Sequence, residues 1–162
     1  MRNKQKGFSL IELLIVVAII LIIAAIAIPN LLRSKMAANE SSAVGSMRTI
    51  NTAEVSYVTA YPNQGFSVSI AALGGAAPCA VATTAAACLI DNTLALANSA
   101  ATAKSGYWFT YASAGGPPST YSMTGQPSLA GSTGQRGFFT DQTGVIRYAI
   151  TGVATVASSP IQ

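Results

Sequence analysis

The side chains of this chain that are able to do chemistry are few and scattered. Its 162 residues include five acidic side chains, two cysteines and no histidine. Without histidine, neither a Ser–His or Cys–His nucleophile nor a histidine-bound metal is possible, and two thiols alone do not complete a zinc site. The carboxylates beyond the N-terminal region form no closely spaced pair; they are Glu40, Glu54, Asp91 and Asp141. The sequence therefore predicts a protein that is not an enzyme and that holds no cofactor or metal.

Cys79 and Cys88 lie in an alanine-rich stretch that reads as a loop. Outside the cytoplasm such a pair is expected to form a disulfide. Closing so short a ring stabilises a fold by about 2–3 kcal/mol in the chain-entropy model. We predict the disulfide, with two buried free thiols as the alternative.

One carboxylate, Glu12, lies where charge is normally excluded. It is near the start of the segment KGFSLIELLIVVAIILIIAAIAIPN, in which Leu13 to Ile28 carry no polar side chain. As a helix, the stretch from Phe8 to Ile28 spans about 31 Å, which is enough to cross the hydrocarbon core of a bilayer. A carboxylate costs about 2.5–3.5 kcal/mol at the bilayer centre and less near its edge. The position of Glu12 therefore requires an explanation.

Basic residues are concentrated before this apolar segment. Arg2, Lys4 and Lys6 contribute most of the net charge of +4. Such a leader favours a cytoplasmic N-terminus, although Arg33 and Lys35 on the far side of the apolar segment weaken this signal. The remainder of the chain is close to neutral, which argues against nucleic acid as a direct partner, because that requires clustered Lys and Arg.

A cleaved secretory signal is the alternative interpretation of the same segment. Ala25-Ile26-Ala27 resembles a signal peptidase site, so the chain could be a soluble secreted binding protein cut after Ala27. However, the apolar run slightly exceeds the usual ~7–15 residues of a signal peptide, and Glu12 interrupts it. We therefore favour a retained membrane helix.

A long helix is expected to position these groups. Pro29 should kink it or open it locally rather than end it. Apolar residues then recur at three- and four-residue intervals, apart from the step at Glu40, which predicts an amphipathic helix over residues 31–61. The segment Tyr61-Pro62-Asn63-Gln64-Gly65 is a strong stop signal. One helix from residue 8 to about residue 60 thus has an apolar first half, residues 8–30, and a second half suited to packing on a sheet.

The remaining residues, 62–162, are expected to form a globular head. An alanine-rich loop region over 71–103 contains a short helix around Ile90 to Ala97. Alternating side chains and turn residues then predict strands at 107–112, 120–124, 138–140 and 145–150. The tail after Ile150 adds an edge strand or stays loose. Asp91 and Asp141 fit helix-cap and turn positions. The fold class is α+β, with the long N-terminal α-helix packed on a small antiparallel β-sheet of about four strands.

The run Gly7-Phe8-Ser9-Leu10-Ile11-Glu12-Leu13, followed by an apolar helix to Pro29, resembles the cleavage and methylation motif of type IV prepilins. The strings GYWFTY and RGFFTDQTGVIRY resemble, more weakly, the C-terminal part of small bacterial pilins and major pseudopilins. The resemblance implies the pilin fold and a leader peptide over residues 1–7. It also implies that prepilin peptidase cuts between Gly7 and Phe8 and methylates the new amine of Phe8.

This cleavage suggests a role for Glu12. The new α-amino group at Phe8 is cationic, with an ordinary pKa of about 7.7–8.0. In a bundle of parallel helices, Glu12 of one subunit can meet the Phe8 amine of a neighbour. Desolvation offsets much of the attraction, but a misaligned neighbour leaves a buried charge unpaired, at about 3–5 kcal/mol. We predict that Glu12 sets subunit register; alternatively, it snorkels to the membrane interface or pairs with its own Phe8 amine.

The resemblance further implies a structural subunit of a type IV pilus. Such a subunit is a single-pass protein of the bacterial inner membrane until assembly machinery there polymerises it into an extracellular homo-oligomeric filament. The filament would serve adhesion, twitching motility or DNA uptake. A major pseudopilin of a type II secretion system is the nearest alternative, although such proteins usually bind calcium through acidic C-terminal loops and this chain has only Asp141 after residue 100.

Overall fold

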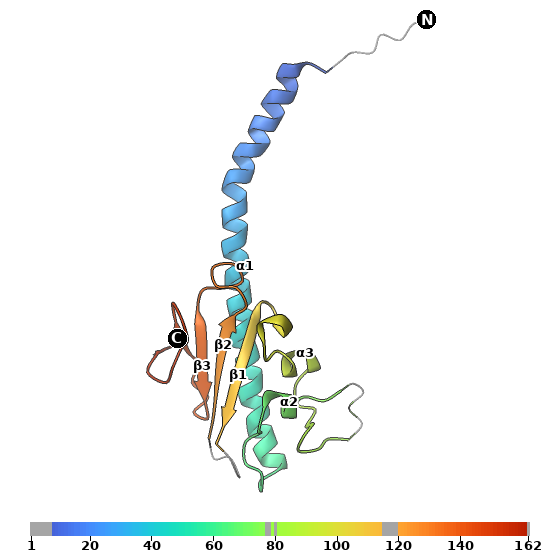
Figure 1. The fold of residues 1–162 in the computed structure, drawn as a ribbon, viewed down its shortest axis with the longest axis vertical. Helices are drawn as coiled ribbons and strands as arrows, with labels where there is room; N and C mark the ends of the chain where they lie inside the picture. Colours follow the sequence, from blue (N-terminus) through green and yellow to red (C-terminus); the bar gives the residue numbers. More distant parts are fainter. Residues whose placement is uncertain (1–7, 77–78, 80, 115–119, 162) are drawn as a thin grey trace, which may run out of the picture. The chain divides into compact units, whose positions relative to one another are not determined.

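A computed structural model describes residues 8–76, 79, 81–114 and 120–161. Its longest element is helix α1, Leu10–Ala60 (Figure 1). The chain divides into two compact units between Lys35 and Met36, so α1 contributes to both. Gly7, on the leader side of the expected cleavage site, lies outside the described residues.

Helix α1 ends where the sequence predicts. Ala60 is followed by the proline and glycine of the stop signal, and Gly65 has a φ of 69°, a left-handed conformation that glycine adopts without steric penalty. Pro29 lies inside the helix, which continues through it. As expected, the proline does not end the helix. The kink at Pro29 stays a prediction.

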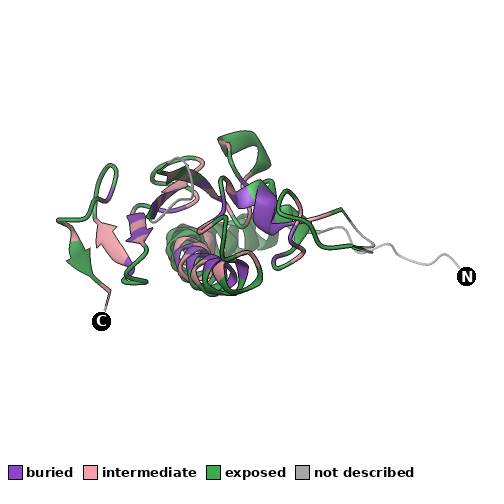
Figure 2. Cartoon of the chain, turned by 90° about the horizontal axis from the view of Figure 1, so that it is seen from below, coloured by how far each residue is buried: buried purple, intermediate pink, exposed green. Residues whose placement is uncertain are grey.

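The second unit contains an antiparallel sheet whose five strands follow the sequence order. The strands are β1 (Tyr107–Ser113), β2 (Tyr121–Pro127), β3 (Gly137–Asp141), β4 (Arg147–Ala149) and β5 (Ser159–Pro160). About four strands were expected; the fifth comes from the C-terminal tail, and β2 runs three residues further than predicted. The two last strands have no buried residue and lie at one end of the sheet, with β5 as the edge strand (Figure 2).

The apolar stripe of α1 packs on this sheet. Met47 and Ile50 are fully buried and belong to one core cluster with Phe109, Met123 and Phe138 of the strands. Figure 2 shows the buried residues of the helix on one part of its circumference and exposed residues around the rest. The expected α+β arrangement is therefore confirmed.

A glycine allows this core to close. Gly125 of β2 pairs with Phe109 of β1, and a Cβ at Gly125 would lie 3.0 Å from the Phe109 ring. Because that distance is shorter than normal carbon–carbon contacts, any larger residue would displace the ring.

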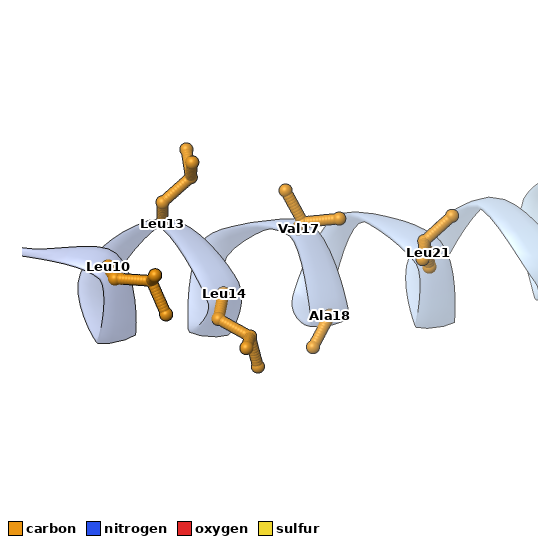
Figure 3. Close-up of a pocket in the computed structure, with 6 residues that line it drawn as sticks. All are labelled: Leu10, Leu13, Leu14, Val17, Ala18 and Leu21. Carbon is orange, nitrogen blue, oxygen red and sulfur yellow. The ribbon is translucent and has the colours of Figure 1, made fainter.

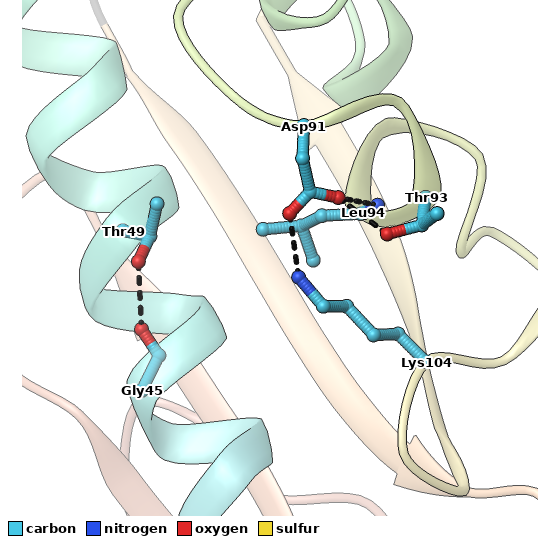
Figure 4. Close-up of polar contacts among 6 residues, drawn as sticks. All are labelled: Gly45, Thr49, Asp91, Thr93, Leu94 and Lys104. Carbon is cyan, nitrogen blue, oxygen red and sulfur yellow. Dashed lines mark hydrogen bonds and ion pairs between the residues drawn. The ribbon is translucent and has the colours of Figure 1, made fainter.

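Short helices connect α1 to the sheet. They are α2 (Ile70–Leu73), α3 (Asn92–Ala95) and the 3₁₀ turn η1 (Ala100–Thr102). Helix α3 is shorter than the predicted 90–97, but Asp91 caps it as expected: its carboxylate accepts from the N–H of Leu94 at 2.7 Å and from Lys104 Nζ at 2.6 Å (Figure 4). The hydrogen bonds from Lys104 and then Thr93 lower the pKa of Asp91 to about 2.

Cys79 and Cys88 form a disulfide. Backbone bonds attach the second half of this ring to α2: the N–H of Cys88 donates to Gly74 at 2.9 Å and that of Leu89 to Leu73 at 2.8 Å. The Tyr57 hydroxyl donates to the Thr84 carbonyl at 2.8 Å, which ties the ring to α1 as well. The disulfide therefore closes a loop that is attached at two further points.

Candidate assembly site

Glu12 accepts a hydrogen bond from its own chain. Helix α1 begins at Leu10, which makes Ser9 the N-cap position and Glu12 the third helical residue. The backbone N–H of Ser9 donates to Glu12 Oε2 at 2.9 Å. This is the glutamate half of a capping box, in which an N3 carboxylate satisfies the N–H of the capping residue. The Ser-x-x-Glu spacing carried that signal, which the sequence analysis did not use.

The surface that follows Glu12 is apolar and uncovered. Each large apolar side chain from Phe8 to Leu32 is between 46% and 80% exposed. Soluble monomers rarely expose contiguous apolar patches above a few hundred Å². The segment is also the one stretch in the described residues that is long and apolar enough to span a membrane. Lipid or other protein must therefore cover it.

One side of this segment carries a shallow apolar groove. Six residues line it: Leu10, Leu13, Leu14, Val17, Ala18 and Leu21. Figure 3 shows Leu13 and Val17 along one edge and Leu14 and Ala18 along the other. Side chains four residues apart form the ridges that interdigitate when helices pack, and the small Ala18 shortens one ridge. The groove has a shape that a ridge of another apolar helix fits.

Two further carboxylates are buried in the second unit, and the sequence analysis assigned a role to neither. Glu40 is 7% exposed and joins α1 to the segment before β3. Its Oε1 accepts from the N–H groups of Gln135 and Arg136 at 2.9 and 3.2 Å, and its Oε2 from Arg136 Nε at 2.7 Å. Burial raises the pKa of Glu40, but these hydrogen bonds and the arginine charge outweigh it and leave the pKa below its ordinary value.

Glu54 is fully buried near the end of α1. Its Oε2 accepts from the N–H of Ser67 at 2.9 Å, and its Oε1 accepts from the hydroxyls of Ser67 and Tyr111 at 2.5 and 2.6 Å. The carboxylate thus links α1, the segment before α2, and β1.

A signal for both residues was present in the sequence. Glu40 and Glu54 occupy steps of the same three- and four-residue series as Met47 and Ile50, so they lie on the apolar stripe of α1. A carboxylate on such a stripe is buried when the head packs and requires donors from the facing elements. In the described ranges, no group of three or more His, Cys, Asp or Glu residues could hold a metal ion.

Comparison with known families defines the class of the N-terminal segment. Residues 2–28 match the model described as the prokaryotic N-terminal methylation motif. The predicted resemblance to type IV prepilins is therefore confirmed over this segment.

Individual relatives match over the same region. The chain is 46% identical over 54 residues to the type IV major pilin protein PilA of Myxococcus xanthus, which is 33% of this chain and 24% of the relative. It is 63% identical over 41 residues, 25% of this chain and 30% of the relative, to the type IV wide pilus major component PilA4 of Thermus thermophilus. With the type IV major fimbrial protein FimA of Dichelobacter nodosus, it shares 54% identity over 52 residues, 30% of this chain and 33% of the relative.

The matched region thus spans about a quarter to a third of the relatives' own lengths. No solved structure matches the chain. The relatives are named as pilus or fimbrial components, and neither the secretion pseudopilin nor the soluble secreted protein is favoured by these matches.

Proposed function

We propose that this chain is a structural subunit of a type IV pilus and has no enzymatic role. Prepilin peptidase removes residues 1–7 and methylates the amine of Phe8. Residues 8–28 anchor the subunit in the inner membrane, and the membrane assembly machinery then polymerises it into an extracellular filament. The filament serves adhesion, twitching motility or DNA uptake.

The observation that carries this proposal is the contrast between the two parts of the chain. The head has a buried apolar core, although some of its large apolar side chains are exposed, whereas every large apolar side chain of residues 8–32 is exposed and none belongs to that core. In the membrane, lipid covers this surface. In a filament, copies of the same helix replace the lipid, so the apolar surface stays out of water throughout and assembly involves no large hydrophobic penalty.

Glu12 has two successive partners in this proposal. Before cleavage it accepts the N–H of Ser9 and stabilises the start of α1. After cleavage, the cationic Phe8 amine of a neighbouring subunit becomes available as the second partner. Because an unpaired charge in the bundle is strongly unfavourable, this contact aligns the subunits.

Shearing of surface filaments followed by mass spectrometry tests the proposal. We expect this chain to be recovered in sheared filaments with an N-terminus at methylated Phe8. If the chain is never recovered in filaments, or if its N-terminus is Ile28, the proposal is wrong. A chain that begins at Phe8 but remains in the periplasm would indicate the secretion pseudopilin instead.

A further inference from the structure

Two cations follow the apolar segment of α1 and have no carboxylate near them in the sequence. Arg33 and Lys35 come shortly after Ile28, the last residue of that segment, and no acidic residue lies between Glu12 and Glu40. Both side chains are exposed, and neither takes part in an ion pair within the described ranges. Because they weaken the orientation signal of the leader, membrane topology does not explain them.

The two side chains point to different sides of the helix. Helix α1 continues without a break through both positions. Successive residues of an α-helix are about 100° apart, so side chains two residues apart point in nearly opposite directions. Arg33 and Lys35 therefore cannot both face one flat protein surface, whereas lipid that surrounds the helix reaches both.

The level of these residues along α1 matches the headgroup region of a bilayer that holds residues 8–28. At 1.5 Å per residue, Arg33 and Lys35 lie about 7.5 and about 10.5 Å beyond Ile28, and the polar region of a leaflet is about 5–8 Å thick. Side chains of an α-helix lean towards its N-terminus, which at this end of the segment is the direction of the bilayer. Their long stems therefore bring both charges back to the level of the lipid phosphates.

Phosphate is an anion that both side chains bind well. An arginine donates two parallel N–H bonds to phosphate oxygens, and a lysine binds phosphate as a point charge. Close to a surface of anionic lipid, each Lys or Arg strengthens binding about fivefold. No carboxylate nearby in the sequence neutralises Arg33 or Lys35, so this attraction is retained.

We propose that Arg33 and Lys35 form a binding site for anionic phospholipids in the leaflet through which the helix leaves the membrane. This inference rests on the proposed function, because it requires residues 8–28 to span the bilayer. Each side chain binds a lipid phosphate on its own side of the helix. Both contacts are broken when the subunit leaves the membrane for a filament.

Native mass spectrometry of the full chain in detergent micelles, titrated with phosphatidylglycerol or phosphatidylcholine, tests this directly. We expect the wild type to bind phosphatidylglycerol more tightly than the zwitterionic lipid. Arg33→Gln and Lys35→Gln should each weaken phosphatidylglycerol binding about fivefold and leave phosphatidylcholine binding unchanged. Both residues are exposed, so the variants should keep the helical circular dichroism of the wild type.

Two further variants serve as controls. Arg33→Lys keeps the charge and should bind phosphatidylglycerol within about twofold of the wild type. Arg48→Gln removes the same charge from the second unit and should bind as the wild type does. Equal affinity of the wild type for the two lipids, or equal weakening by Arg48→Gln and Arg33→Gln, would overturn the proposal.

Failure of this inference is distinguishable from failure of the proposed function. Filaments built from a chain without a preference for phosphatidylglycerol would overturn the lipid site alone. A chain that shows the preference but is never recovered in filaments would leave the lipid site in place and contradict the pilus.

Discussion

Arg136 lies at the centre of a contact that ties α1 to the sheet. Its Nε donates to Glu40, and its guanidinium carbon lies 5.8 and 5.6 Å from the ring centres of Phe138 and Tyr148. The arginine therefore connects the helix to β3 and β4 through one charged hydrogen bond and two cation–π contacts. Its side chain is 42% exposed, whereas that of Glu40 is 9% exposed, so most of the desolvation falls on the carboxylate.

Glu40→Gln should lower the free energy of unfolding by about 1.5–3 kcal/mol, because it replaces a charge-assisted hydrogen bond with an amide N–H that faces another donor. Fluorescence of the single tryptophan, Trp108, during chemical unfolding measures this loss. Glu54→Gln is the matched control and should lose distinctly less, because two of the donors to Glu54 are hydroxyls, which can turn and accept from an amide nitrogen, whereas the N–H donors to Glu40 cannot. Equal losses would mean that the type of donor is unimportant.

The N-cap residue of α3, Asp91, predicts how the stability of the head depends on pH. The pKa of Asp91 is lowered from 3.8 to about 2, so its contribution to stability is fully present above the unfolded value and is lost as the pH falls through about 2. The melting temperature should therefore decline between these values in the wild type. Asp91→Asn keeps a good N-cap but cannot titrate, so this part of the decline should be absent. If the melting temperature of Asp91→Asn declined with falling pH as steeply as that of the wild type, the pKa assigned to Asp91 would be contradicted.

At the scale of elements, the head depends on one face of α1. Ile50 is fully buried, whereas Val55 on the same helix is 66% exposed. Ile50→Ala should destabilise the head by about 2–5 kcal/mol through lost burial and a cavity. Val55→Ala, a comparable truncation on the free face, should change stability by no more than about 0.5 kcal/mol. Similar effects at both positions would show that the helix does not pack on the sheet as described.

The disulfide allows a second test at this scale. Replacement of Cys79 and Cys88 together by serine should reduce the free energy of unfolding by about 2–3 kcal/mol. Backbone bonds and the Tyr57 contact still attach the loop, so the sheet should keep its structure and Trp108 its native fluorescence. Loss of the folded sheet in this variant would mean that the sheet requires the disulfide and that the other contacts of the loop do not suffice.

The sequence predicts the elements better than their contacts. Periodicity gives the extent of α1, and the alternation around Phe109 gives the strands, because both patterns record which face is buried. The roles of Glu40 and Glu54 are not predictable in the same way. Their donors lie 95 and 13 residues away along the chain, and nothing local identifies Gln135 or Ser67 as partners. The fifth strand was also uncertain, since two residues are too short to show alternation.

At the scale of the whole molecule, two variants of Glu12 distinguish charge pairing from helix capping as the requirement for assembly. Glu12→Gln keeps an acceptor for the Ser9 N–H, since glutamine also forms capping boxes, but it removes the charge. Glu12→Ala removes both. If charge pairing aligns the subunits, both variants should be inserted and cleaved but yield few filaments. Normal yield from Glu12→Gln alone would show that helix capping, rather than charge, is what assembly requires.

A cryo-electron microscopy reconstruction of sheared filaments tests the account most directly. We expect residues 8–28 of all subunits to lie together along the filament axis, shielded from water. The Glu12 carboxylate should then lie within about 4 Å of the Phe8 amine of a neighbouring subunit, the usual limit for an ion pair. A filament in which these helices face solvent, or in which Glu12 contacts only its own Ser9, would contradict the proposed assembly.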